Sequence, residues 1–193
     1  EACRLTRTLV SQPPSSAAVR DAWMREQGFG VDPEGYFVRL PLQKQVRAGT
    51  APPATISYFW PRRLAEDEDT RRRMHALRDI GPHLQELYDE VHPADWIYYQ
   101  DRSQAVVTYP YMDARNAIPP DFDWSTYVPY RTAGPEVNPQ RRTRWALPRE
   151  DYGEQGPFCI VNAPVYLEDE FLGIWSIDVS LDSMLPPALA VSR

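Results

Sequence analysis

The chain has 193 residues, of which 42% are hydrophobic and 12% aromatic, so it is long enough and apolar enough to bury a core in one domain. A net charge of -6 and a pI near 5.1 give no general attraction to phosphate backbones, which argues against nucleic-acid binding. No apolar run approaches the roughly 18 to 20 residues that span a bilayer, and 20 prolines predict many irregular connections.

The first 60 residues predict short helices and short strands. Residues 5–10 and 17–27 have helical character, and residues 35–40 and 55–60 have the composition of strands. We expect a helical and irregular elaboration over residues 1–60, a core over 61–185, and a tail over 186–193 that leads toward a removed membrane segment. Because the chain opens on Glu1 and not on Met, we expect a fragment whose targeting or membrane segments have been removed.

Residues 66–91 give the clearest helical pattern. Four acidic residues open it, which suits the positive end of the helix dipole, and Leu77, Ile80 and Leu84 begin an apolar stripe at helical spacing. Gly81-Pro82 interrupts the pattern, so we expect a kink or two abutting helices. The run 71–73 is all arginine and follows the acidic residues directly, which indicates a solvated face whose charges are locally compensated.

The rest of the chain reads as strands and one long excursion. Residues 95–100 and 104–109 predict a hairpin, and residues 110–142 form an aromatic-rich excursion. Residues 143–147 predict a third strand, and residues 157–184 a closing hairpin of two long strands. This order predicts an α+β fold, an antiparallel sheet of five or more strands with a long N-terminal helix packed on one face.

Asp178 is the most informative single residue, because it sits in the middle of an otherwise apolar strand. A buried carboxylate is costly unless it is paired, so Asp178 is either a structural hydrogen-bond anchor or the floor of a ligand site. Strand alternation places Phe171, Gly173 and Trp175 on an apolar face, which we expect to lie under the helix. The other face carries Ser176 and Asp178 and is expected to lie toward the excursion.

Other kinds of site receive weaker support. Cys159 lies on the apolar face of its strand and is predicted to be a buried core thiol; a thiol hydrolase that uses Cys159 stays open as a weaker alternative. His75, His83 and His92 lack the spacing of metal ligands. We therefore expect no metal, no cofactor and no catalytic residue in this chain.

Five segments together resemble the extracytoplasmic Cache sensor domains of bacterial transmembrane receptors, over about residues 70–184. They are Val107-Thr108-Tyr109-Pro110, residues 127–133 (YVPYRTA), Arg144-Trp145, Ala163-Pro164-Val165-Tyr166 and residues 171–180 (FLGIWSIDVS). The resemblance implies a PAS-like fold behind a long N-terminal helix, with no catalysis in this domain. It also implies a periplasmic or extracellular location and ligand-dependent signalling to a kinase, chemoreceptor, cyclase or phosphatase module.

The resemblance carries over only part of the family's binding residues. Members that bind amino acids have an Arg-x-Trp-Tyr element, a Tyr-x-Asp element and the final Asp. Tyr130 matches the Tyr of the first element and Asp178 the final Asp, whereas Tyr127 stands in the place of the Arg that clamps a carboxylate. Asp151 matches the Asp of the second element, with Arg149 in the place of its Tyr.

We therefore predict a small-molecule site in the PAS-like pocket, with a ligand whose identity the sequence does not give. The predicted ligand-binding residues are Tyr109, Tyr111, Tyr127, Tyr130, Trp145, Arg149, Asp151 and Asp178. A homodimer is compatible with this reading. The alternative function is that of a ligand-free dimerisation or structural module, in which the chain's own side chains fill the pocket.

Overall fold

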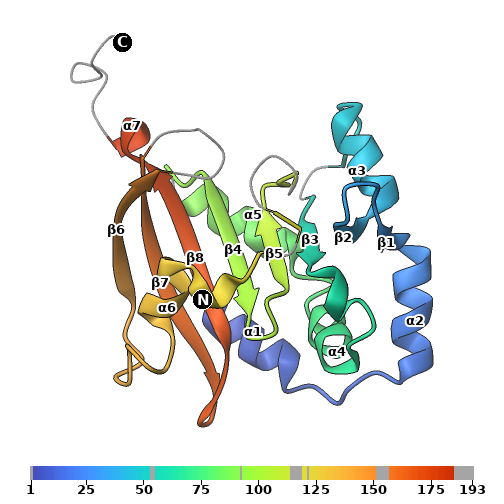
Figure 1. Cartoon of the computed structure of the whole chain (residues 1–193), viewed down its shortest axis with the longest axis horizontal. Coiled ribbons are helices and arrows are strands. Elements are labelled where there is room, and N and C mark those ends of the chain that lie inside the picture. The colour runs from blue at the N-terminus through green and yellow to red at the C-terminus, as the bar shows by residue number, and fades with distance from the viewer. Residues whose placement is uncertain are drawn as a thin grey trace.

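The computed structural model describes residues 2–52, 55–91, 93–113, 119–120, 122–150 and 157–184. Within these ranges, eight strands form one antiparallel sheet in the order β1-β2-β3-β5-β4-β8-β7-β6 (Figure 1). The strands are β1 (Phe29–Val31), β2 (Phe37–Arg39), β3 (Ser57–Trp60), β4 (Trp96–Asp101), β5 (Val106–Tyr109), β6 (Arg144–Glu150), β7 (Pro157–Leu167) and β8 (Glu170–Ser180). The predicted α+β class and antiparallel sheet are confirmed.

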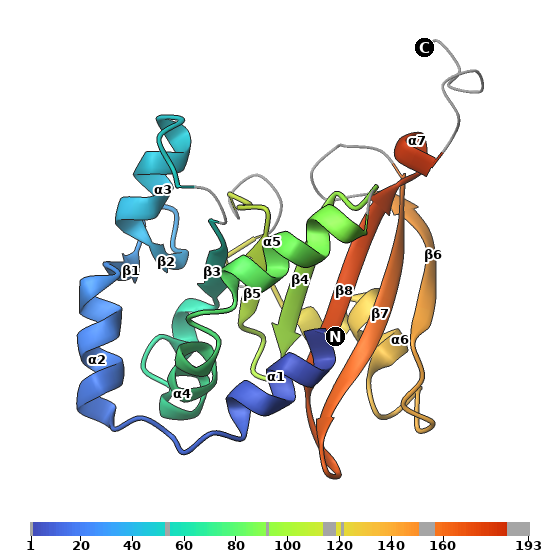
Figure 2. The ribbon, with the colours of Figure 1, turned by 180° about the vertical axis from the view of Figure 1, so that it is seen from behind.

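The helices flank this sheet. They are α1 (Ala2–Val10), α2 (Ala17–Glu26), α3 (Leu40–Arg47), α4 (Glu68–Ala76), α5 (Gly81–Glu90), α6 (Val128–Ala133) and α7 (Leu181–Met184), with single 3-10 turns η1 (Arg62–Leu64) and η3 (Trp124–Thr126). Viewed from behind, α1, α4 and α5 cover one face of the sheet (Figure 2). Among the described helices, none is both long enough and apolar enough to cross a bilayer.

The five strands after residue 95 have the strand order of a PAS-like sheet. They lie in the order β5-β4-β8-β7-β6, which is second, first, fifth, fourth and third along the chain. Beyond β5 the sheet continues through β3, β2 and β1, because Ser57 of β3 pairs with Thr108 of β5. The first 60 residues therefore extend the same sheet, and their division from the core at residue 60 stays a prediction.

The face toward α4 and α5 holds the main core. Leu77, Ile80 and Leu84 are at most 1% exposed and pack with sheet residues such as Ile97 and Val107. The helical pattern of residues 66–91 is two abutting helices, as predicted, because α5 begins at Gly81-Pro82. The first of the two, α4, is capped by Asp67, whose carboxylate accepts a hydrogen bond from the Thr70 amide at 2.7 Å.

The N-terminal helix α1 belongs to this layer. It packs on β7, and the Trp175 indole donates a hydrogen bond to the Thr6 hydroxyl at 2.8 Å, both groups being buried. Cys3, also in α1, packs against the main core, and burial raises the pKa of its thiol above the ordinary value. The start of the described chain is therefore fixed to β7 and β8.

One arginine of the run 71–73 contradicts the prediction of a solvated face. Arg73 is 3% exposed and its Nε lies 2.9 Å from the carboxylate of Asp101, which is fully buried. Asp101 also accepts hydrogen bonds from the amide and the hydroxyl of Ser103, at 2.8 and 2.6 Å. Arg73 therefore fastens α4 to the turn between β4 and β5.

A bulge in β8 reverses one expected side-chain direction. Val165 pairs with Gly173 but Tyr166 pairs with Phe171, so Leu172 is the extra residue. Phe171 consequently leaves the helix face and packs against Tyr130 of α6, with ring centroids 6.0 Å apart, whereas Leu172 joins the main core. The placement of Phe171 on the helix face was wrong, because simple alternation does not count a bulge.

Candidate ligand site on the sheet

A line of polar side chains crosses the sheet on the face opposite α1, α4 and α5. Directly paired residues of six neighbouring strands make up this polar row: Ser57, Thr108, Tyr98, Ser176, Asn162 and Arg144. All except Arg144, which lies on the edge strand β6, are buried. A buried polar line through the middle of a sheet is unusual, since such positions are normally apolar.

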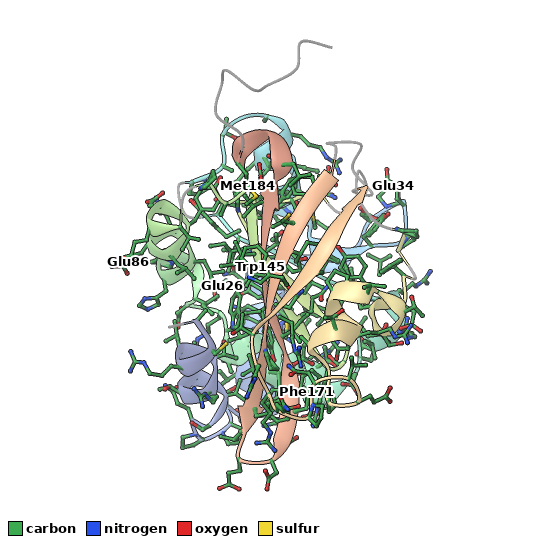
Figure 3. All side chains as sticks on the ribbon, turned by 90° about the vertical axis from the view of Figure 1, so that its left-hand side faces the viewer. Glu26, Glu34, Glu86, Trp145, Phe171 and Met184 are labelled. Atoms are coloured by element: carbon green, nitrogen blue, oxygen red, sulfur yellow. The ribbon has the colours of Figure 1, made fainter. Side chains whose placement is uncertain are left out.

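The aromatic excursion covers the polar row. Trp124 of η3 packs with Phe59 and Phe122, and Tyr127, which joins η3 to α6, packs on Trp124 with ring centroids 5.4 Å apart. The helix α6 lies against β6 and β7 on the same face. Figure 3, which views the sheet from its β6 edge, shows α6 on one side of the sheet and α1 and α5 on the other. The polar face therefore lies toward the excursion, as predicted.

Part of the polar row is satisfied internally. The Ser176 hydroxyl donates to the Asn162 side-chain oxygen at 2.7 Å, and the Ser57 hydroxyl accepts a hydrogen bond from the Met112 amide at 3.3 Å. Three other groups on this face have no hydrogen-bonding partner among the described residues. They are the Thr108 hydroxyl, the Asn162 side-chain nitrogen and both polar atoms of Gln100, which lies two residues after Tyr98 on β4.

These groups carry a large energetic penalty if nothing meets them. Gln100 and Asn162 are fully buried and Thr108 is 1% exposed. A buried polar group without a partner costs about 1–3 kcal/mol, so the four atoms together would cost an amount comparable to the roughly 5–15 kcal/mol that stabilises a typical domain. In folded proteins such groups are normally met by water, by a bound molecule or by another part of the chain.

Asp178 lies next to this row. It is 9% exposed, and it pairs with Trp96 of β4 on one side and Ile160 of β7 on the other. Burial, followed by the neighbouring Asp178 carboxylate and Tyr127, raises the pKa of the Tyr98 hydroxyl well above its ordinary value. The structure thus brings Asp178, Tyr98 and Tyr127 together, and both the anchor and the ligand-floor readings of Asp178 stay open.

The other predicted site residues do not gather around Asp178. Tyr130 packs on Phe171, seven residues away along β8 from Asp178, and burial raises its pKa above the ordinary value. Tyr109 pairs with Ile97, so it lies on the helix face, where it packs on Tyr88 of α5 with ring centroids 5.3 Å apart.

The four remaining candidates do not form a group. Trp145 is 63% exposed on the edge strand β6, on the side of the sheet opposite Arg144 (Figure 3). Tyr111 is half-buried just after β5 and lies close to Arg39. Burial lowers the pKa of Arg39, and Tyr111 partly opposes this effect. The side chain of Arg149 and all of Asp151 lie outside the described residues, so their part in a site stays a prediction.

Sequence reasoning missed the polar row as a unit. Gln100, Thr108 and Asn162 each stand in a strand that was predicted correctly, but no single strand shows that the three meet. A polar residue in the middle of several consecutive strands is the signal that could have found them, once the strands are aligned in PAS-like order. The strand pairing supplies that alignment.

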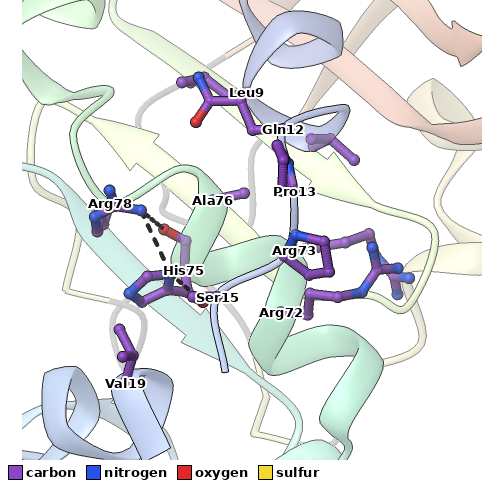
Figure 4. A pocket seen from close by; sticks show the side chains of 12 residues that line it. Leu9, Gln12, Pro13, Ser15, Val19, Arg72, Arg73, His75, Ala76 and Arg78 are labelled. Atoms are coloured by element: carbon purple, nitrogen blue, oxygen red, sulfur yellow. Dashed lines mark hydrogen bonds between the residues drawn. The ribbon is translucent and has the colours of Figure 1, made fainter. Parts of the chain in front are cut away.

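The residues considered for other chemistry lie elsewhere. Cys159 is free and half-buried on the helix side of β7, so it does not face the polar row. His75 contacts the Ser15 hydroxyl at 3.1 Å and Arg78 at 3.4 Å in a hollow between α4 and the segment that joins α1 to α2 (Figure 4). Burial, followed by Arg78 and Arg20, lowers the pKa of His75. Within the described ranges, no three His, Cys, Asp or Glu side chains are grouped as metal ligands.

Comparison with known proteins gives no match to any protein-family model and none to a curated protein. Among solved structures, the ligand-binding domain of the Pseudomonas aeruginosa PAO1 amino-acid chemoreceptor PctC, in complex with GABA, is 20% identical with a TM-score of 0.43, over 63% of this chain and 52% of that one. The ligand-binding domain of the Campylobacter jejuni chemoreceptor Tlp3, with L-norvaline, is 15% identical with a TM-score of 0.43, over 92% and 56%. The ligand-binding domain of Mlp24 with asparagine is 17% identical with a TM-score of 0.40, over 94% and 61%. The chain thus spans between 52% and 61% of these structures.

Proposed function

We propose that this chain is an extracytoplasmic sensor domain of the Cache type, which binds a small polar molecule between the polar row and the aromatic excursion. The observation that carries the proposal is Gln100, a fully buried amide whose two polar atoms have no partner among the described residues. The side-chain nitrogen of Asn162 and the hydroxyl of Thr108 lie on the same face and also have no partner among the described residues. A site that is to be filled by a ligand needs polar groups of this kind, held in place and unpaired.

The groups available favour particular ligands. Gln100 offers a donor and an acceptor, Asn162 offers a donor, and Asp178 offers a carboxylate that suits an amine or a hydroxyl. The position of the family's carboxylate-clamping Arg is occupied by Tyr127, and the arginine of the polar row, Arg144, is exposed at the edge. We therefore favour a ligand recognised through amine, hydroxyl or amide groups over one held by a carboxylate clamp.

The receptor context is also part of the proposal. The resemblance in sequence and the PAS-like strand order support a periplasmic or extracellular location, membrane anchoring through flanking segments, and signalling to an output module in the same receptor. On this proposal the domain itself does no catalysis. Homodimerisation stays a prediction.

The test is a thermal-shift screen against amino acids, carboxylates, amines, purines and sugars. A ligand present at 100 times its dissociation constant adds about 2.7 kcal/mol, which raises the unfolding midpoint of a chain of this size by roughly 5–10 °C. We expect Asn162→Leu and Asp178→Asn each to abolish the shift. Trp145→Ala, an exposed residue on the other side of β6, is the matched control and should keep it.

Two outcomes would count against the proposal. If both site variants keep full binding, the pocket is misplaced. If no compound in the screen shifts the midpoint and Asn162→Leu is also as stable as the wild type, the polar row needs no ligand, and a ligand-free structural module becomes the better account.

A further inference from the structure

A hollow with a volume of about 450 Å³ lies away from the polar row, on the far side of β2 from Val38. It is open to solvent and is lined by the end of α2, by α3, by parts of the segment between α3 and β3, and by the beginning of α5. Its volume falls within the range of about 300–1,000 Å³ that is typical of small-molecule pockets. None of the residues predicted from the sequence as ligand-binding lines it.

Arg39 is the unusual group of this cavity. Its guanidinium is half-buried and donates through Nη2 to the side-chain oxygen of Gln27, while its Nε is buried and has no partner among the described residues. No carboxylate of the described chain forms an ion pair with it. Burial lowers its pKa, which is the effect of a cation held without a counter-ion.

The second arginine of the cavity is already engaged. Arg78 places its Nε 3.3 Å from the carboxylate of Asp79, and its Nη1 donates to the backbone oxygen of His75 at 3.2 Å (Figure 4). The two acidic residues that line the cavity, Glu26 and Asp79, are exposed, and neither pairs with Arg39. The unmet positive charge therefore belongs to Arg39.

The walls suit an anion with an apolar part. Leu42 and Ile56 contribute buried apolar surface. The cavity also contains Gly81, at the beginning of α5, a helix of ten residues that has no side-chain cap at its N-terminus. The positive end of the helix dipole at such a terminus favours a negative charge and adds to the effect of Arg39, although Pro82, the next residue, has no N–H to donate.

We propose that this cavity is a second ligand site, which binds a small molecule with one carboxylate and an apolar body. The carboxylate pairs with the guanidinium of Arg39, and the apolar body lies on Leu42 and Ile56. This site is distinct from the one proposed on the polar row. It favours a carboxylate, whereas the polar row favours amine, hydroxyl or amide groups. A carboxylate there supplies the counter-charge that Arg39 lacks among the described residues, through the charge-assisted hydrogen bonds that guanidinium groups favour.

The test compares acids with their neutral amides, by calorimetric titration and thermal shift. Benzoate and hexanoate are the acid probes, and benzamide and hexanamide are the controls of matched shape. We expect the acids to bind and raise the unfolding midpoint, the amides to bind at least tenfold more weakly, and Arg39→Met to lose acid binding. Asn162→Leu on the polar row should bind the acids as the wild type does.

A pair of surface variants keeps the test independent of Arg39's own role in folding. Gln45 is exposed and lines the cavity, so Gln45→Glu should weaken acid binding at least threefold and Gln45→Lys should strengthen it, without harm to the fold. The proposal is overturned if no acid binds, if acids and amides bind equally, or if both Gln45 variants leave acid affinity unchanged. Loss of acid binding in Asn162→Leu would overturn it as well, because the acids would then occupy the polar row.

Discussion

Replacing Gln100 by methionine should stabilise the ligand-free protein while it removes ligand binding. The two side chains have nearly the same length and volume, but methionine brings no polar atoms that need partners. Gln100 is fully buried, and neither of its amide atoms has a partner among the described residues. At about 1–3 kcal/mol for each unpaired polar group, and with water meeting part of the need, we expect a gain of about 1–3 kcal/mol in the free energy of unfolding.

For a chain of 150–250 residues, each 1 kcal/mol moves the unfolding midpoint by roughly 2–4 °C, so the midpoint should rise by about 2–12 °C. Urea unfolding and thermal unfolding without ligand measure the gain, and titration with any compound found in the screen measures the loss of binding. The matched control is Gln43→Met, because Gln43 is also buried but donates to the Asp32 carboxylate at 3.1 Å. This control should lose about 1–3 kcal/mol. If Gln100→Met is destabilised as much as Gln43→Met, the Gln100 amide is satisfied within the fold and the reasoning fails.

Three other changes test the fold itself. Gly173→Ala should cost at least about 2–3 kcal/mol, because φ is +153° and an added Cβ would lie 2.2 Å from the backbone oxygen of Gln100. Asp101→Asn should cost at most about 3–5 kcal/mol, because it removes the buried counter-charge of Arg73 and leaves only the more exposed Asp69 to pair with it; urea unfolding measures both. Although burial opposes it, hydrogen bonds from neighbouring arginines hold the pKa of Asp69 at about 2. The wild type should therefore lose stability as pH falls from about 4 toward 2, and Asp69→Asn should lose less over that range.

Each of the three has a result that would contradict it. Gly49→Ala is the control for Gly173, since φ is +68° there but an added Cβ meets open space, and equal losses at the two glycines would rule out the steric account. A loss below about 1 kcal/mol for Asp101→Asn would mean that the ion pair is replaceable. Identical acid unfolding profiles for the wild type and Asp69→Asn would remove Asp69 from the account of acid stability.

Much of the fold could be predicted from the sequence, because strand alternation and helix periodicity are local signals. The two abutting helices at Gly81-Pro82, the hairpin of β4 and β5, and the direction of the Asp178 face are all of this kind. The predicted side-chain direction of Phe171 failed. It depends on a local feature, a bulge, that simple strand alternation does not reveal. The bulge at Leu172 reverses Phe171, and it depends on Gly173 accepting a φ of +153° close to the neighbouring strand.

The candidate site was predictable only in part, because it depends on pairing between strands that are far apart in the sequence. Asp178 and Tyr127 stood out as single residues, and the structure brings them together near Tyr98. Gln100 did not stand out, since one amide in a strand is ordinary until the pairing shows that the chain buries it without a partner. The prediction that Arg73 lies on a solvated face failed for a related reason, because its buried partner Asp101 is 28 residues away in sequence.

The hydrogen bond between Trp175 and Thr6 gives the sheet a mechanical property. Trp175 and the next residue, Ser176, leave β8 on opposite sides, so one strand touches both the N-terminal helix and the polar row. Consecutive residues are joined through a planar, stiff peptide unit, and a displacement of Ser176 is therefore also a displacement of Trp175. Strain imposed on β8 from the excursion side would reach α1 within a single residue step, without passing through α4 or α5.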